Sequence, residues 1–542
     1  MNNNKKLFIY LPILFAIVFV AGMFLGVKLI RFTPGSGNPF RDFFSFNLNR
    51  YDKFNDVINY IEASYVDSVS KEKLTEDAIN DLLQGLDPHS YYISAAEFND
   101  VNDPLMGNFE GIGVEFRIIK DTVVVINTVA GGPSEKRGVR AGDRIVKVDG
   151  KPFAGIKITN EKVLKTLKGE KGTDVKLSIY RPGVRNLIDF VVTRDVIPTY
   201  SVDIAYMVKG NIGYIKLSKF SKTTPQEFDV ALTKLKSSGM KKLILDLRGN
   251  GGGFLDAAIY LADEFLSKDK LIVYTEGKHR PKKSSYATDE GDFESGNLVI
   301  LIDEMSASAS EIVAGAIQDN DRGTIIGRRS FGKGLVQEQV ELLDGSAIRL
   351  TVARYHTPTG RCIQKSYKNG IADYDNEFYN RFLDGELLNP DSIHFADSLK
   401  FKTPGGKIVY GGGGIMPDVF VPIDSAQNNR FFLLLYNKGI INQFGFDYSD
   451  KNRKSLKGLF INKDSFINSF NISPVVFDEF ISYAEKNGVK KDPHGIKVSG
   501  DEIRTELKAS IGRNLFGNEG YYPIINRIDN TFLKAVNVLN KK

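Results

Sequence analysis

A short apolar run that leads into a helix of small residues constrains the fold of this chain most. Residues 298–302 are continuously apolar, as expected of a buried strand. Residues 306–310 then alternate serine with alanine. A serine at such a strand-to-helix junction lies beside free backbone N–H groups and the positive end of the helix dipole, where an oxyanion can be stabilised. The helix itself is indicated by apolar residues at helical spacing, namely Ile312, Val313, Ala316 and Ile317.

A lysine enclosed by glycines follows this helix. Lys333 stands between Gly332 and Gly334, which let the backbone bend and approach other segments closely. A lysine buried at such a place loses its proton more readily and can serve as a base. A purely structural role also fits, because alternating serine and alanine make a tightly packed helix start with one serine as N-cap. Residue chemistry alone leaves both interpretations open.

The serine and lysine motifs together resemble a family signature. Residues 306–311 and 331–334, followed by Gln337, are similar to the signature of the carboxyl-terminal processing (tail-specific) serine peptidases. The resemblance implies that Ser308 is the nucleophile and Lys333 the base. It also implies that Gln337 orients the lysine, one turn further on if that segment is helical, and that the catalytic core is similar to crotonases and ring-forming Clp peptidases.

Two acidic residues also match positions of the family motif. They are Glu311 and Asp319, and a structural role suits both equally well. His89, in the turn at residues 86–92, is tempting as a base, but a structural turn residue is the favoured interpretation.

A second buried strand, residues 242–247, runs into a glycine-rich loop and then a helix. Strand, glycine loop and helix would also suit phosphate binding. The dinucleotide pattern fails, however, because Phe254 stands where its last glycine would be. The family resemblance implies that Gly252 or Gly253 gives a backbone N–H to the oxyanion hole, with Ala309 as the second donor.

Residues 107–195 change to short strands and resemble a PDZ domain. Its groove would be bordered by a helix at residues 160–167. Consecutive backbone N–H groups in the binding loop would hold a terminal carboxylate, the bound peptide would add as a strand, and glycines would let the backbone approach the anion. This loop is formed by Gly111, Ile112, Gly113 and Val114.

The N-terminus predicts a membrane anchor. Residues 7–30 are apolar and uncharged apart from Lys28, which is long enough to span a bilayer. A cleaved signal peptide is the alternative, although the cleavage site is poor. With Lys5 and Lys6 kept in the cytoplasm, we expect a single-pass anchor in the inner (cytoplasmic) membrane and a catalytic part in the periplasm.

Composition and the remaining motifs exclude other functions. A net charge of +6 without a long basic block does not indicate nucleic-acid binding. Residues 327–334 nearly fit a nucleotide P-loop, but Gly334 replaces the hydroxyl residue that would hold magnesium. Cys362 is the lone cysteine, and a nucleophile pair with His356 lacks a third orienting group. We expect neither a metal nor another cofactor.

The sequence therefore predicts a multidomain α/β serine endopeptidase. We expect it to cleave periplasmic or membrane-associated proteins near their C-termini, after the PDZ domain has bound the free tail, and a homodimer or an activating partner is possible. A non-enzymatic PDZ adaptor for protein tails is the main alternative, and a thioester-using crotonase-type enzyme is the third. The expected domains are an anchor (1–31), a linker (32–50), a helical segment (51–106), the PDZ domain (107–195), the catalytic core (196–424) and a helical extension (425–542) that packs on the core or contacts partners.

Overall fold

The computed structural model describes residues 16, 18–22, 52–424, 426 and 428–541. The chain divides into two compact units, residues 1–77 and 78–542. The expected linker lies outside the described residues, and so does the expected anchor except for residues 16 and 18–22. No helix within the described ranges is both long and apolar enough to cross a membrane.

The described part of the first unit consists of helical segments and the connection between α3 and α4. Helix α3 spans Lys53–Ser64, and the side chain of Asp52 caps it by accepting the N–H of Asn55. Helix α4 spans Lys71–Gln84 and continues into the second unit.

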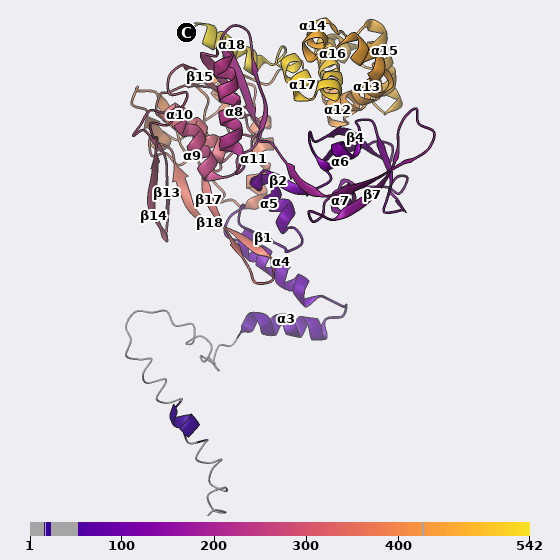
Figure 1. The fold of residues 1–542 in the computed structure, drawn as a ribbon. Coiled ribbons are helices and arrows are strands. Elements are labelled where there is room, and N and C mark those ends of the chain that lie inside the picture. Colours follow the sequence, from indigo (N-terminus) through magenta and orange to yellow (C-terminus); the bar gives the residue numbers. More distant parts are fainter. Residues whose placement is uncertain (1–15, 17, 23–51, 425, 427, 542) are drawn as a thin grey trace, which may run out of the picture. The chain divides into compact units, whose positions relative to one another are not determined.

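The second unit is built on a six-stranded sheet (Figure 1). Neighbouring strands run parallel, except that the edge strand β10 is antiparallel to β11. In spatial order the strands are β10 (Val202–Met207), β11 (Ile212–Leu217), β12 (Lys242–Asp246), β15 (Asn297–Ile302), β16 (Thr324–Gly327) and β21 (Val419–Phe420).

Helices cover both faces of this sheet. Because side chains alternate along a strand, Leu243 and Leu245 of β12 join the hydrophobic cluster on one face, and Ile244 joins the cluster on the other. The first face carries α8 (Thr224–Ser237), α9 (Leu255–Asp263) and α10 (Ala309–Asp319), and the second carries α18 (Asn530–Lys541). The end of the expected extension therefore completes the core of the sheet.

A second, antiparallel sheet contains the long hairpin β17–β18. Its strands are β1 (Tyr91–Ile93), β18 (Ala347–His356), β13 (Leu271–Gly277), β14 (Arg280–Tyr286) and β17 (Leu335–Glu341). Residues 336–343 and 347–353, joined by Asp344 and Gly345, predict the β17–β18 hairpin from the sequence alone, but β1 and the β13–β14 hairpin are not evident from it. Residues 371–410 add α11 (Ile371–Leu383) and the pair β19 (Lys400–Lys402) and β20 (Ile408–Tyr410).

Residues 107–195 form a separate sheet around their own hydrophobic core. Strand β3 is at its edge, where β4 is its only partner among the described strands. The short pair β2 (Asn108–Gly111) and β9 (Asp195–Pro198) links this sheet to the rest of the chain. The other elements are β3 (Val114–Ile118), β4 (Val123–Thr128), α6 (Pro133–Arg137), β5 (Arg144–Val148), β6 (Lys151–Pro152), α7 (Asn160–Leu167), β7 (Asp174–Tyr180) and β8 (Ile188–Thr193).

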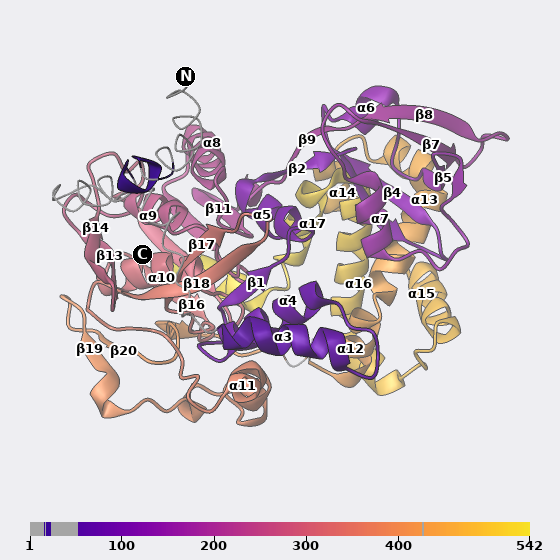
Figure 2. The ribbon, with the colours of Figure 1, turned by 90° about the horizontal axis from the view of Figure 1, so that it is seen from below.

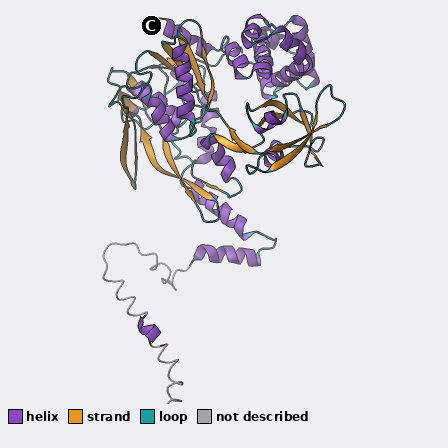
Figure 3. Cartoon of the chain, viewed as in Figure 1, coloured by secondary structure: helices purple, strands orange, loops and turns teal. Residues whose placement is uncertain are grey.

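The C-terminal extension is helical and has a hydrophobic core of its own (Figure 3). Ser473 caps α15 with its side chain, and Gly488 follows the end of that helix in a left-handed conformation. The helices are α12 (Arg430–Asn437), α13 (Ile440–Leu459), α14 (Lys463–Ser469), α15 (Pro474–Lys486), α16 (Pro493–Phe516) and α17 (Asn518–Ile525).

Candidate active site

Ser308 lies at the N-cap of α10 with an unusual backbone conformation. Its φ of 54° and ψ of −113° are rarely adopted by a residue with a Cβ atom. The two neighbouring serines are buried and bonded, since Ser306 Oγ donates to the carbonyl of Leu247 and Ser310 Oγ to that of Asn250, each at 2.9 Å. The Ser308 hydroxyl lines a cavity and donates no hydrogen bond to another described residue. Of the three serines, only Ser308 is free to react.

Lys333 reaches the same cavity from the loop before β17. Its Nζ donates to Oε1 of Gln337 at 2.9 Å. Burial, followed by the positive charge of Arg349, lowers the pKa of Lys333, whereas the charges of Asp87 and Glu311 act in the opposite direction. The lowered pKa favours the neutral amine, which is the form that can accept a proton.

Gln337 lies on a strand, so the condition that the segment after Lys333 is helical is not met. It belongs to β17, which pairs with β18 along the hairpin. The register shifts between Val336 and Gln337, and a bulge of this kind re-aims a side chain. The Nε2 of Gln337 donates to the carbonyl of His89, so the amide is held at both ends. Non-local pairing in the hairpin therefore outweighs the helical spacing of the local sequence.

His89 supports the site through its backbone. Its ring Nε2 lies 2.7 Å from the hydroxyl of Tyr374, and the ring does not line the cavity. Burial, followed by the charge of Lys333, lowers the pKa of His89 to about 4. The carboxylate of Asp87 accepts the N–H groups of His89 and Ser90 at 2.8 and 2.9 Å, which fixes the turn. The neutral ring and the fixed carbonyl suit the structural interpretation of His89.

A buried carboxylate joins the serine loop to the lysine loop. Oε2 of Glu311 accepts the backbone N–H of Ser308 at 2.8 Å and that of Lys333 at 2.9 Å. Its Oε1 accepts the N–H of Gly332 at 2.8 Å and the hydroxyl of Ser330. Burial raises the pKa of Glu311 to about 7, although these four hydrogen bonds lower it. Glu311 thus holds the two candidate catalytic segments in one unit.

Tyr355 makes a second connection between the same segments. Its hydroxyl donates to the carbonyl of Lys333 at 2.6 Å and lies 3.2 Å from that of Ser308. Burial raises the pKa of Tyr355 well above its ordinary value, so the hydroxyl keeps its proton. The sequence gives no sign of this role, because only the hairpin brings β18 to the site.

Asp319, the other acidic residue of the motif, has a different environment. It forms an ion pair with Arg361 at 2.7 Å, and both side chains are fully buried. Its carboxylate also accepts the hydroxyl of Thr359 at 2.7 Å. Asp319 does not line the cavity and anchors the segment around Arg361 to the C-terminal end of α10.

The glycine loop presents free backbone donors to Ser308. Gly252 has a φ of +99°, and a Cβ atom there would lie 2.8 Å from that of Ser308. The N–H of Gly252 already donates to Oδ1 of Asn250 at 2.9 Å. The N–H groups of Gly253 and Ala309 have no acceptor among the described residues. Of the predicted donors, Gly253 and Ala309 are therefore the pair available to an oxyanion.

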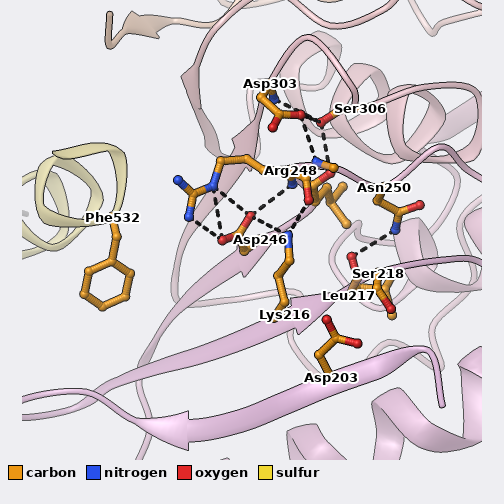
Figure 4. A network of polar contacts seen from close by, with 12 residues as sticks. Asp203, Lys216, Leu217, Ser218, Asp246, Arg248, Asn250, Asp303, Ser306 and Phe532 are labelled. Carbon is orange, nitrogen blue, oxygen red and sulfur yellow. Dashed lines mark hydrogen bonds and ion pairs between the residues drawn. The ribbon is translucent and has the colours of Figure 1, made fainter. Parts of the chain in front are cut away.

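A charged network fixes the strand end beneath this loop (Figure 4). Asp246, at the end of β12, is 1% exposed and accepts from Nε and Nη2 of Arg248 and from Nζ of Lys216. Burial raises the pKa of Asp246, but the charges of Arg248 and Lys216 outweigh it and hold the pKa well below its usual range. Arg248 also pairs with Asp529 at 2.7 Å, which connects the loop to the residues just before α18.

The candidate cavity has a volume of about 900 Å³. One wall comes from α5 (Phe98–Met106), which the sequence pattern does not connect with the site, and Arg349 of β18 contributes to another. The cavity brings together all six residues predicted for the nucleophile, base, orienting amide and oxyanion hole, namely Ser308, Lys333, Gln337, Gly252, Gly253 and Ala309.

The predicted carboxylate-binding loop has unpaired donors as well. The N–H groups of Ile112 and Gly113 have no acceptor within the described chain, whereas their carbonyls accept from Ser134 and Val129. Gly113 has a φ of +72°, which favours glycine. The loop adjoins the free edge of β3, so a terminal carboxylate and an extended tail could be held together.

Comparisons with known proteins agree with this architecture. Residues 211–373 match the sequence profile of peptidase family S41, residues 111–192 that of the PDZ domain, and residues 431–517 that of a family of unknown function, DUF8443. The carboxy-terminal-processing protease of Bartonella bacilliformis is 38% identical over 358 residues, which are 64% of this chain and 80% of that protein. The carboxy-terminal processing protease CtpA of Bacillus subtilis is 36% identical over 318 residues, 58% of this chain and 67% of that protein. The solved structure of a photosystem II D1 C-terminal processing protease is 28% identical, covers 68% of this chain and 92% of its own, and has a TM-score of 0.35.

The fold and the matches together define a serine-type peptidase that carries a PDZ domain. The chain belongs to peptidase family S41, and to its carboxy-terminal processing proteases. The alternatives of a non-enzymatic adaptor and a thioester-using enzyme are set aside, because the relatives are peptidases.

Proposed function

We propose that this peptidase works through a Ser308–Lys333 dyad and selects protein substrates by their free C-terminal tails. One observation carries the proposal: the Ser308 hydroxyl, which donates to no other described residue, and the lysine amine with a lowered pKa open into one cavity, while Glu311 ties their backbones together. The free N–H groups of Gly253 and Ala309 face the same space.

In the proposed reaction, Ser308 Oγ bonds to the scissile carbonyl carbon and its proton passes to neutral Lys333 Nζ. The oxyanion accepts hydrogen bonds from the N–H groups of Gly253 and Ala309. When the C–N bond breaks, the lysine ammonium protonates the leaving amine. Water then hydrolyses the serine ester, again with Lys333 as base. Since no hydrogen bond joins the described side chains of Ser308 and Lys333, the reaction includes a side-chain rotation that brings them together.

Gln337 has a positioning role in this proposal. Its amide is fixed by the carbonyl of His89, and its Oε1 accepts from the lysine amine. An acceptor at that place restrains Nζ near Ser308 without supplying a negative charge, which would raise the lysine pKa.

The location and the substrates are part of the proposal. The apolar run at residues 7–30 supports an anchor in the inner membrane, which would place the catalytic part in the periplasm. The unpaired N–H groups of Ile112 and Gly113 support recognition of a terminal carboxylate. Periplasmic and membrane-associated proteins, cleaved near their C-termini, would then be the substrates.

Labelling with a fluorophosphonate probe, followed by peptide mass mapping, tests the dyad. We expect the label on Ser308 and its loss in Ser308→Ala and Lys333→Ala, which should also fail to hydrolyse peptides. Ser306→Ala and Ser310→Ala should keep measurable hydrolysis, because both hydroxyls are used in structural hydrogen bonds. An active Ser308→Ala variant, or a label on Ser306, would refute the assignment.

A further inference from the structure

The tail-binding edge of the PDZ domain is open along one side of β3. This strand ends the sheet, and within the described part of the chain its residues 114–118 pair with β4 alone. Its outer N–H and C=O groups have no partner within the described residues. An extended peptide can add there as a further strand, with its carboxylate at the loop that precedes Val114.

The far end of this edge is bounded by the C-terminal extension. A pocket of about 400 Å³ lies between Phe116 and Ile118 of β3, Asn160 at the start of α7, and the first turns of α13. The extension lines it with Gly439, Asn442, Gln443 and Phe446, and β3 and the turn after it add Arg117 and Ile119. The groove of the PDZ domain therefore continues onto a helix from outside that domain.

Two contacts hold α13 in this position. Phe446 is 1% exposed and packs in one cluster with Val124 and Ile126 of β4. Asp450 forms an ion pair with Arg144 of β5 at 3.0 Å. Figures 1 and 2 both show α13 beside β4. The helix is therefore a fixed wall of the groove.

The polar side chains of the pocket are available to a ligand. Arg117, Asn160 and Gln443 make no side-chain hydrogen bond or ion pair within the described chain. Burial lowers the pKa of Arg117, while the charge of Glu115 raises it and the charge of Arg513 lowers it. A guanidinium without an ion pair, beside free amides, is complementary to a carboxylate side chain.

The register along β3 indicates which tail residue meets this pocket. A tail antiparallel to β3 advances about 3.3 Å per residue, as the strand does. With the last tail residue opposite Val114, the third residue from the end lies opposite Phe116 and the fifth opposite Ile118. These positions border the pocket.

We propose that α13 is the second half of the tail-binding groove, and that it selects tails with an acidic side chain three to five residues from the C-terminus. The carboxylate of that side chain is received by Arg117, with Gln443 and Asn160 as hydrogen-bond donors. This inference rests on the proposed recognition of free tails by the PDZ loop. It gives the matched family of unknown function, residues 431–517, a role in substrate choice.

The test measures peptide binding to the full chain carrying Ser308→Ala, so that no probe is cleaved. The first probe is a labelled decapeptide that ends in valine and has glutamate at the fourth position from the end. It is compared with the same decapeptide carrying glutamine at that position and with the glutamate decapeptide amidated at its C-terminus. The fourth probe is the labelled C-terminal tripeptide. Fluorescence anisotropy gives each Kd. Arg117→Gln and Gln443→Ala are compared with Lys451→Ala, an exposed position on the same helix.

We expect Arg117→Gln to weaken binding of the glutamate decapeptide by about tenfold, as expected when one charge-assisted hydrogen bond is lost. Gln443→Ala should weaken it less, and Lys451→Ala should not change it. The tripeptide should bind all variants equally, because it lacks the glutamate and stops opposite Phe116, before Arg117. Equal weakening of the tripeptide would reveal a folding defect of the PDZ domain and would overturn the inference.

Two outcomes separate this inference from the proposed function. In the first outcome, amidation abolishes binding, but neither Arg117→Gln nor the glutamine peptide changes the Kd measured with the glutamate decapeptide. Tail recognition then stands, and the role of α13 is wrong. If the amidated and free decapeptides bind equally, recognition of the terminal carboxylate is wrong, and the inference fails with it.

Discussion

Ser308 and Lys333 have two side-chain partners of their backbone groups in common, Glu311 and Tyr355. Their N–H groups point to one oxygen atom, Oε2 of Glu311, at 2.8 and 2.9 Å, and their carbonyls both lie within reach of the Tyr355 hydroxyl. A shift of either loop would therefore break bonds to the other. The distance between nucleophile and base is set by two buried side chains that do not themselves take part in the proposed reaction.

Replacing Glu311 with glutamine should separate activity from folding and tail binding. Glutamine offers one acceptor oxygen where the carboxylate accepts four donors, and its NH₂ group would face backbone N–H groups. We expect kcat to fall about 100-fold, which is the size expected for a small misplacement of reacting groups. Binding of a decapeptide to the PDZ domain should stay unchanged. An unaltered kcat would show that the shared carboxylate does not position the dyad.

Glu311 should also make the free energy of unfolding depend on pH. Because burial raises the pKa of Glu311 from 4.5 to about 7, the folded protein holds this proton more tightly than the unfolded chain does. The contribution of Glu311 to the free energy of unfolding is therefore complete below pH 4.5 and is lost as the pH rises through about 7. The loss is of the order of 3 kcal/mol. Chemical denaturation at several pH values should show a steeper decline for the wild type than for Glu311→Gln, and parallel curves would contradict this.

The rate of hydrolysis should rise with pH. Lys333 accepts a proton only when neutral, and burial lowers its pKa below 10.5, so its active fraction grows earlier than that of an exposed lysine. Protonation of Glu311 should also lower the rate as the pH falls below about 7, because it removes acceptors from the Ser308 and Lys333 N–H groups. The profile of kcat/KM between pH 5 and 10 checks this. A profile in which no group titrates below about pH 9 would count against Lys333 as the base.

Gly252→Ala should inactivate the enzyme. Its Cβ would lie 2.8 Å from the Ser308 Cβ and from the carbonyl oxygen of Ala307, at a φ of +99° that strains any residue with a side chain. We expect peptide hydrolysis to be lost and the unfolding free energy to fall by about 1–3 kcal/mol. Gly251→Ala is the matched folding control, since no heavy atom lies within 4 Å of its added Cβ. It should unfold at the wild-type temperature, and equal destabilisation of both variants would refute the steric explanation.

Removing the free carboxylate of a substrate should slow its cleavage. The loop at Ile112 and Gly113 binds the terminal carboxylate in the proposed function, and tethering raises the effective concentration of the tail at Ser308 to the order of millimolar for a short flexible connection. One protein substrate with an apolar last residue is compared with its amidated form and with a form that ends in aspartate. The unmodified tail should be cut fastest at substrate concentrations below KM. Equal rates for all three would exclude tail recognition.

The sequence identifies local features of the site better than its long-range connections. The alternating Ser306–Ser310 segment and the glycine-enclosed Lys333 point to residues that do line one cavity, and helix α7 begins and ends where its pattern indicates. The four-residue interval to Gln337 is misleading, because an interval of four suits a helical turn while pairing with β18 imposes a strand. Tyr355 lies on the second strand of this hairpin, and no local pattern indicates that its hydroxyl reaches the carbonyls of Ser308 and Lys333.

The packing of α18 on the central sheet has a consequence for the order of events during synthesis. The face formed by Ile244, Val299 and Leu301 is covered by Phe532 and Leu539, which lie far later in the chain than the strands they cover. While the ribosome is still producing the extension, this apolar face is exposed. The loop residue Arg248 also lacks its ion-pair partner Asp529 at that stage. We therefore expect the nascent peptidase to stay incompletely folded until α18 emerges, so that proteolytic capacity arises only after the PDZ domain and the helices that flank its groove have been made.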